Sequence, residues 1–90
     1  MSNTDKTSSL VFPCEFPIKI VGKADLEFQG EVMAIFRKYF TSLPESAINM
    51  AYSKGNKYLS LTVTIDAQSQ EQLDAIYRDL SSNQHILMVL

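Results

Sequence analysis

Residues 58–65, YLSLTVTI, decide the fold. Apolar side chains alternate with polar ones at every second position, which predicts a β-strand with one face in the core and the other in solvent. Residues 48–53 show the same alternation, so we expect them to form a neighbouring strand. Between the two, Gly55 can adopt the positive φ that a tight turn needs, which predicts a β-hairpin.

Two helices are expected, one on each side of this hairpin. Residues 26–40 gather apolar side chains on one face of a helical wheel, and Asp25 before them is a suitable N-cap. Ser69 and Gln72 have the spacing of a capping box, which predicts the start of a second helix. The apolar positions expected in the core are Phe28, Val32, Met33, Phe36, Tyr39 and Phe40 in the first helix, and Leu73, Ile76, Tyr77 and Leu80 in the second.

Two more strands are expected, one near each end of the chain. Pro17 cannot donate to a strand ladder, so the first strand is expected at residues 18–21 with this proline at its start. The last is expected at residues 85–90. The order strand-helix-strand-strand-helix-strand predicts an α+β ferredoxin-like sandwich. Its four-stranded antiparallel sheet has the order 4-1-3-2 with two helices on one face, which leaves the other face uncovered.

Length and composition limit the class of protein. Ninety residues predict a single domain at residues 10–90, preceded by a polar segment at residues 1–9 that we expect to be disordered. A net charge of −2 argues against a domain dedicated to nucleic acid. A single cysteine fits a reducing compartment, and no apolar run is long enough to span a bilayer. We expect a cytoplasmic protein with no nucleic-acid and no membrane partner.

Few residues could carry out chemistry. Cys14 lacks the second cysteine of a C-x-x-C metal pair, and the one histidine, His85, lies outside any recognisable nucleophile motif. The turn at residues 22–25 lacks the arginine with which acylphosphatases of this fold hold phosphate. We therefore expect no catalytic residues, no metal site and no cofactor. An enzyme of unknown reaction is the weakest of the alternatives.

The expected topology brings two turns together at one end of the sheet. The turn after the first strand and the turn of the hairpin both contain lysine and glycine, beside the N-terminus of the first helix. Lysines and helix N-termini favour anions. We therefore expect a small anionic ligand, a carboxylate or a phosphate, at this end. The candidate ligand-binding residues are Gly22, Lys23, Lys54, Gly55, Asn56 and Lys57.

A second candidate function is self-association. Residues 85–90 are apolar on both faces of the expected strand, which leaves apolar surface exposed beside the uncovered face. A glycine on the solvent side of the first helix suits a close contact. We expect a homodimer or the docking of a protein partner, and the alternative is that residues 10–12 fold back over the open face. The candidate interface residues are Gly30, Tyr58, Leu87 and Val89.

Two stretches resemble the YbeD family of small bacterial proteins. They are residues 12–22, FPCEFPIKIVG, and residues 53–67, SKGNKYLSLTVTIDA, and the second likeness continues through Glu71-Gln72, Tyr77 and Met88-Val-Leu90. The resemblance implies a ferredoxin-like fold similar to the ACT regulatory domains. It also implies a non-enzymatic regulatory or adaptor module, linked to lipoate metabolism and acting by protein-protein contact. The alternative that it leaves open is an ACT-like domain that senses a small molecule.

Overall fold

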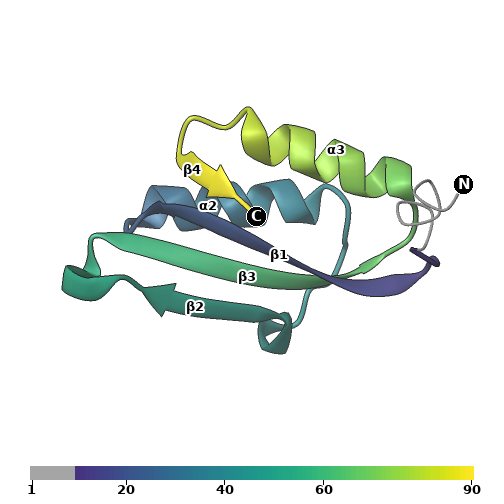
Figure 1. Ribbon diagram of the computed structural model, residues 1–90, viewed down its shortest axis with the longest axis horizontal. Coiled ribbons are helices and arrows are strands. Elements are labelled where there is room, and N and C mark those ends of the chain that lie inside the picture. The colour runs from purple at the N-terminus through teal and green to yellow at the C-terminus, as the bar shows by residue number, and fades with distance from the viewer. Residues whose placement is uncertain (1–9) are drawn as a thin grey trace, which may run out of the picture.

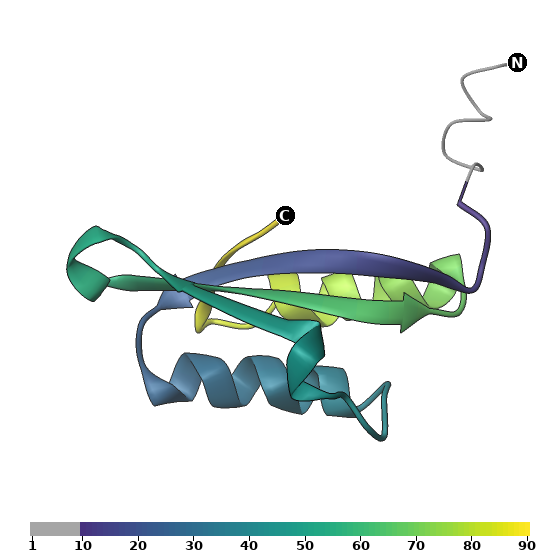
Figure 2. The same cartoon turned by 90° about the horizontal axis from the view of Figure 1, so that it is seen from below.

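The computed structural model describes residues 10–90, so the segment predicted to be disordered, residues 1–9, lies outside it. The strands form one antiparallel sheet in the order β2-β3-β1-β4, and both helices lie on the same side of it (Figures 1 and 2). This confirms the ferredoxin-like sandwich and its strand order. The elements are β1 (Cys14–Lys23), α2 (Leu26–Arg37), β2 (Ile48–Tyr52), β3 (Tyr58–Ala67), α3 (Gln70–Ser81) and β4 (Ile86–Val89), with short 3₁₀ turns at Glu45–Ala47 and Lys54–Asn56.

The first strand is longer than predicted, and Pro17 lies inside it. Lys19 exchanges backbone hydrogen bonds with Leu90 at 3.2 and 2.8 Å, so its amide and carbonyl point toward β4. Backbone groups point to the same edge at every second residue, so the nitrogen of Pro17 points there too. The paired part of β4 ends beside Lys19. The proline is therefore tolerated because no strand of residues 10–90 lies where its missing amide would donate.

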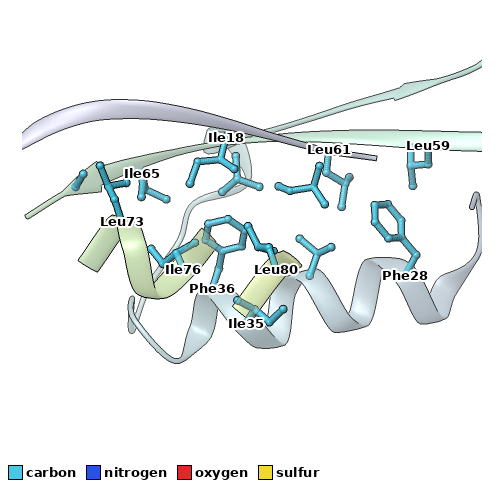
Figure 3. Close-up of a cluster of buried hydrophobic side chains, with 14 residues drawn as sticks. Ile18, Phe28, Ile35, Phe36, Leu59, Leu61, Ile65, Leu73, Ile76 and Leu80 are labelled. Atoms are coloured by element: carbon cyan, nitrogen blue, oxygen red, sulfur yellow. The ribbon is translucent and has the colours of Figure 1, made fainter. Parts of the chain in front are cut away.

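The core fills the space between the sheet and the two helices (Figure 3). Phe28 lies below Leu59, and Phe36 points from α2 toward the sheet. The alternation that predicted the third strand is confirmed, because every second side chain from Leu59 onward is buried. The buried side chains of the core are Ile18, Ile20, Phe28, Val32, Ile35, Phe36, Leu59, Leu61, Val63, Ile65, Ala67, Leu73, Ile76 and Leu80.

The first helix ends earlier than predicted. The amides of Lys38 and Tyr39 donate to carbonyls three residues back, at 3.1 and 3.0 Å, so the chain tightens and leaves the α-helix after Arg37. Tyr39 and Phe40 therefore pack at the margin of the core instead of on a helical face. The prediction also missed Ile35, which is buried, whereas Met33, which was expected in the core, is only half-buried.

Both predicted helix caps are present. The Asp25 carboxylate accepts a hydrogen bond from the Phe28 amide at 2.8 Å. The Ser69 hydroxyl accepts one from the Gln72 amide at 3.1 Å, and the Gln72 side chain accepts in return from the amide of Gln68 at 2.9 Å. These bonds satisfy amides that a helix start otherwise leaves without partners.

The two helices are joined at one point by a charged cluster. The Asp79 carboxylate accepts a hydrogen bond from the Lys38 ammonium and another from the Tyr39 hydroxyl, both at 2.7 Å. The two donors hold the pKa of Asp79 below its ordinary value of 3.8. Within residues 10–90 this is the one salt bridge, and it ties the end of α2 to α3.

Gly22 permits the closest approach between the sheet and α2. A Cβ built at this position would meet the ring of Phe28, with the ring Cγ only 2.8 Å away. Gly30, by contrast, lies on the solvent side of α2, and its Cβ would meet nothing within 4 Å. The two glycines therefore have different structural roles.

We expect Gly22→Ala to lower the free energy of unfolding by about 1–3 kcal/mol, because the added methyl group overpacks the core against Phe28. Gly30→Ala is the matched control and should raise it by about 0.5–1 kcal/mol, since alanine is the better helix former. Urea denaturation of both variants measures the two effects. A Gly22→Ala protein as stable as the parent would contradict the packing role.

We expect Asp79→Asn to destabilise the protein at pH 7, and the difference from the parent to vanish at low pH. The pKa of Asp79 is lower when folded, so its contribution is present above about pH 4 and is lost as the pH falls through the folded value. Urea denaturation across this range measures the effect. Asp74→Asn makes the same charge change on the same helix, away from the salt bridge. A pH dependence equal for both variants would contradict the assignment.

Candidate functional site

The face of the sheet opposite the helices, here called the open face, is covered by no element of residues 10–90 (Figure 2). Figure 1 looks onto it, with α2 passing behind β1. The alternative placed residues 10–12 over it, but Leu10 and Val11 are exposed and Phe12 packs against the core. The side chains of the open face are Glu15, Pro17, Lys19, Val21 and Lys23 of β1, Asn49 and Ala51 of β2, Tyr58, Ser60, Thr62, Thr64 and Asp66 of β3, and Met88 and Leu90 at the C-terminal end.

Apolar side chains gather in one half of the open face. Val21 is paired with Met88 on one side and with Ser60 on the other. Tyr58, Met88 and Leu90 remain 44%, 52% and 61% exposed. A shallow depression of about 180 Å³ lies beside them, over Lys19 and Val21. This half of the sheet therefore presents contiguous apolar surface to solvent.

The two predicted turns do lie side by side at the adjoining end of the sheet. The amide of Ala24 donates to the carbonyl of Lys57 at 3.0 Å, and Lys23 is paired with Tyr58. Lys23, Lys54 and Lys57, here called the lysine end, are all exposed, and none of them makes a salt bridge within residues 10–90. Their uncompensated charge makes this end of the open face attractive to anions.

The other predicted ligand residues shape the turns. Gly55 has φ 83° and Asn56 has φ 56°, the left-handed conformation in which glycine and asparagine cost least. Gly22 is buried against Phe28, so it faces the core. Asp25 places its carboxylate at the N-terminus of α2 as the cap. An anion at this end would therefore be held by lysine side chains, since the helix N-terminus already holds a carboxylate.

The far end of the open face is acidic. Glu15 and Asp66 lie directly opposite each other on β1 and β3, and both are exposed. Like charges at directly opposed positions of an antiparallel pair are destabilising. No lysine or arginine of residues 10–90 forms a salt bridge with either carboxylate. The open face is thus polarised along its strands, with an acidic end, a lysine end and apolar surface between them.

The predicted interface residues lie on several surfaces. Tyr58 is on the open face, and Leu87 is exposed on the edge strand β4. Val89 is half-buried on the core side, where it pairs with Ile20. Gly30 is on the helix side of the molecule. A single flat interface cannot therefore contain all four.

Sequence reasoning missed a groove on the helix side. It lies between α2 and β2, has a volume of about 530 Å³, and its apolar lining includes Met33, Leu43 and Met50. The alternation in β2 predicted that Met50 would lie on the buried face of the strand, but it is 48% exposed. The helices pack on the central strands and leave β2 without a covering layer. The sequence predicts two helices for four strands, and this count already indicates that an edge strand would lack a covering helix.

The remaining candidate features of residues 10–90 are metal-ligating side chains, the cysteine, the histidine and apolar helices. Within it, no three His, Cys, Asp or Glu side chains converge as a metal site would need. Cys14 is half-buried, and the amide of His85 donates to the Asn83 side chain at the start of β4. No helix in residues 10–90 is long and apolar enough to cross a membrane.

The comparison with protein families is decisive for the classification. The family model described as "Protein of unknown function (DUF493)" matches residues 7–90. The chain belongs to this family. The resemblance to the YbeD family is thereby confirmed, because YbeD proteins are members of the DUF493 family, which also carries the name UPF0250.

Relatives in the DUF493 family match over nearly the whole chain. A UPF0250 protein of Paraburkholderia phytofirmans is 42% identical over 79 residues, which cover 88% of this chain and 89% of that one. A UPF0250 protein of Janthinobacterium is 41% identical over the full length of both. The solution structure of protein HP0495 from H. pylori has a TM-score of 0.69 at 14% identity, covers 90% of this chain and 85% of its own, and shows the shared fold.

Proposed function

We propose that this protein is a non-enzymatic regulatory or adaptor module that acts by protein-protein contact through the open face. The observation that carries the proposal is an uncovered sheet face with exposed Tyr58, Met88 and Leu90 beside the lysine end. Contiguous apolar surface rimmed by charge is typical of protein interaction sites. The partner that suits this half of the face is apolar with an acidic border.

The mechanism of such a module is differential affinity. A small domain without catalytic groups changes a partner only by binding one of its states more tightly than another. The YbeD resemblance points to lipoate metabolism as the pathway in which the partner should be sought first. We favour a regulatory module over an enzyme, because residues 10–90 do not place a nucleophile beside a general base.

A second candidate is an ACT-like domain that senses a small anion at the lysine end. The observation that favours it is the hydrogen bond from Ala24 to Lys57, which brings both lysine-bearing turns together. Three exposed ammonium groups at one end of a sheet would suit a carboxylate or phosphate ligand.

We expect the double variant Lys23→Glu/Lys57→Glu to retain the partner roughly tenfold less well than the parent protein in a pull-down, because the acidic rim of the partner would meet like charge. Quantitative mass spectrometry of the captured proteins measures the effect. The tag belongs at the N-terminus, since Leu90 is hydrogen-bonded to Lys19.

Arg37→Glu/Arg78→Glu is the matched control for that experiment. It changes the net charge by the same amount, but both arginines are exposed on the helices, away from the open face. The control should capture the same partner as the parent. Equal capture by all three proteins would exclude the open face as the docking site.

The sensing candidate predicts heat on titration with inorganic phosphate or a small dicarboxylate in isothermal calorimetry. Lys23→Ala should weaken the binding, and added salt should weaken it further, because the attraction is between exposed charges. Arg78→Ala is the control, since it removes one positive charge far from the lysine end. No heat with the parent protein, or equal binding by both variants, would exclude the sensor.

A further inference from the structure

We propose that a second copy of this chain covers the open face, in a two-fold symmetric dimer whose strands run in opposite directions across the interface. The dimer itself does not depend on the proposed function. Its regulatory consequence does rest on that function, because self-association would withdraw the same surface from any other protein.

The first step is the charge polarity of the face. Glu15 and Asp66 form the acidic end, and the lysine end lies at the other extreme of β1, about 26 Å away at the usual rise of a strand. The charges at both ends are exposed and make no salt bridge within residues 10–90. The carboxylates of one end are therefore complementary in charge to the ammonium groups of the other.

The second step is symmetry. A homodimer with a two-fold axis makes every contact twice, once in each direction. If the axis crosses the strands, each acidic end faces the lysine end of the other copy, and both attractions form together. If the axis ran along the strands, lysine would face lysine and carboxylate would face carboxylate. Electrostatic complementarity therefore selects the first arrangement.

The third step is the surface between the two ends. An axis that crosses β1 near Lys19, midway between Glu15 and Lys23, places the Pro17 row of one copy over the Val21 row of the other. Pro17 is paired with Thr64, and Val21 with Met88 and Ser60, so Pro17, Val21 and Met88 supply the apolar part of this contact and Thr64 and Ser60 the polar part. The two Lys19 side chains approach each other at the axis, which costs affinity unless their long stems carry the ammonium groups outward.

The fourth step is size. Two strands of ten residues and two shorter ones give the open face a flat area of roughly 450 Å² at standard strand spacings. A stable interface buries about 800 Å² of accessible surface on each partner. The dimer is therefore expected to be weak, reversible, and sensitive to salt. The fraction of dimer would therefore change with protein concentration, and a partner that binds the open face more tightly would displace the second copy.

The test is sedimentation velocity of the purified protein at low salt, from micromolar concentrations up to about 1 mM, the range in which weak dimers form. We expect the parent protein to dimerise in this range. Glu15→Lys/Asp66→Lys makes both ends of the face basic, and Lys23→Glu/Lys57→Glu reverses two of the three charges of the lysine end, so that both ends are net acidic. Each variant alone should be monomeric, because its two ends repel those of a second copy.

A mixture of the two charge variants should form a heterodimer, since the basic face of one then meets the acidic face of the other. The Arg37→Glu/Arg78→Glu variant should dimerise as the parent does. The proposal is overturned by a parent protein that stays monomeric throughout, by charge variants that dimerise as before, or by a mixture that stays monomeric. None of these outcomes involves another protein, so the pull-down judges the docking proposal separately.

Discussion

The structure depends on one interaction, the antiparallel pairing of β1 with β3. The ladder runs without a shift in register from Cys14 opposite Ala67 to Lys23 opposite Tyr58. Because side chains alternate along a strand, this single register decides which ones enter the core and which reach the open face. It also places the two turns of the lysine end together and sets Glu15 against Asp66. If β3 slipped by one residue against β1, its side chains would exchange the core for the open face.

Sequence predicts best where the physical rule is local. The alternation at residues 58–65, the positive φ of Gly55 and the Asp25 cap each follow from a few neighbouring residues, and all are found. The end of α2 was misplaced because the helical apolar pattern continues past Arg37 while the backbone hydrogen bonds tighten. The position of Pro17 inside β1 could not be predicted, because a strand tolerates a proline where no neighbouring strand needs its amide. That depends on where β4 ends.

In the candidate site, too, some features could be predicted from the sequence and others depend on the tertiary arrangement. Its lysine end could be predicted, because the topology alone brings the two turns together. The acidic end could not, since Glu15 and Asp66 are far apart in sequence and only the register makes them neighbours. Gly30 was predicted as an interface residue because a glycine on the solvent side of a helix suits a close contact, and it was grouped with Tyr58. Their positions on opposite layers follow from which face of the sheet the helices cover.

Pro17 has a consequence for how the sheet ends. β4 pairs with only the second half of β1, so within residues 10–90 no strand pairs with the first half on that side. A strand arriving there from another molecule would find no amide donor at Pro17, and the row of hydrogen bonds would be interrupted. Pro17 therefore makes this edge of β1 a poor template for another strand, at a position where the pairing with β4 does not need its amide.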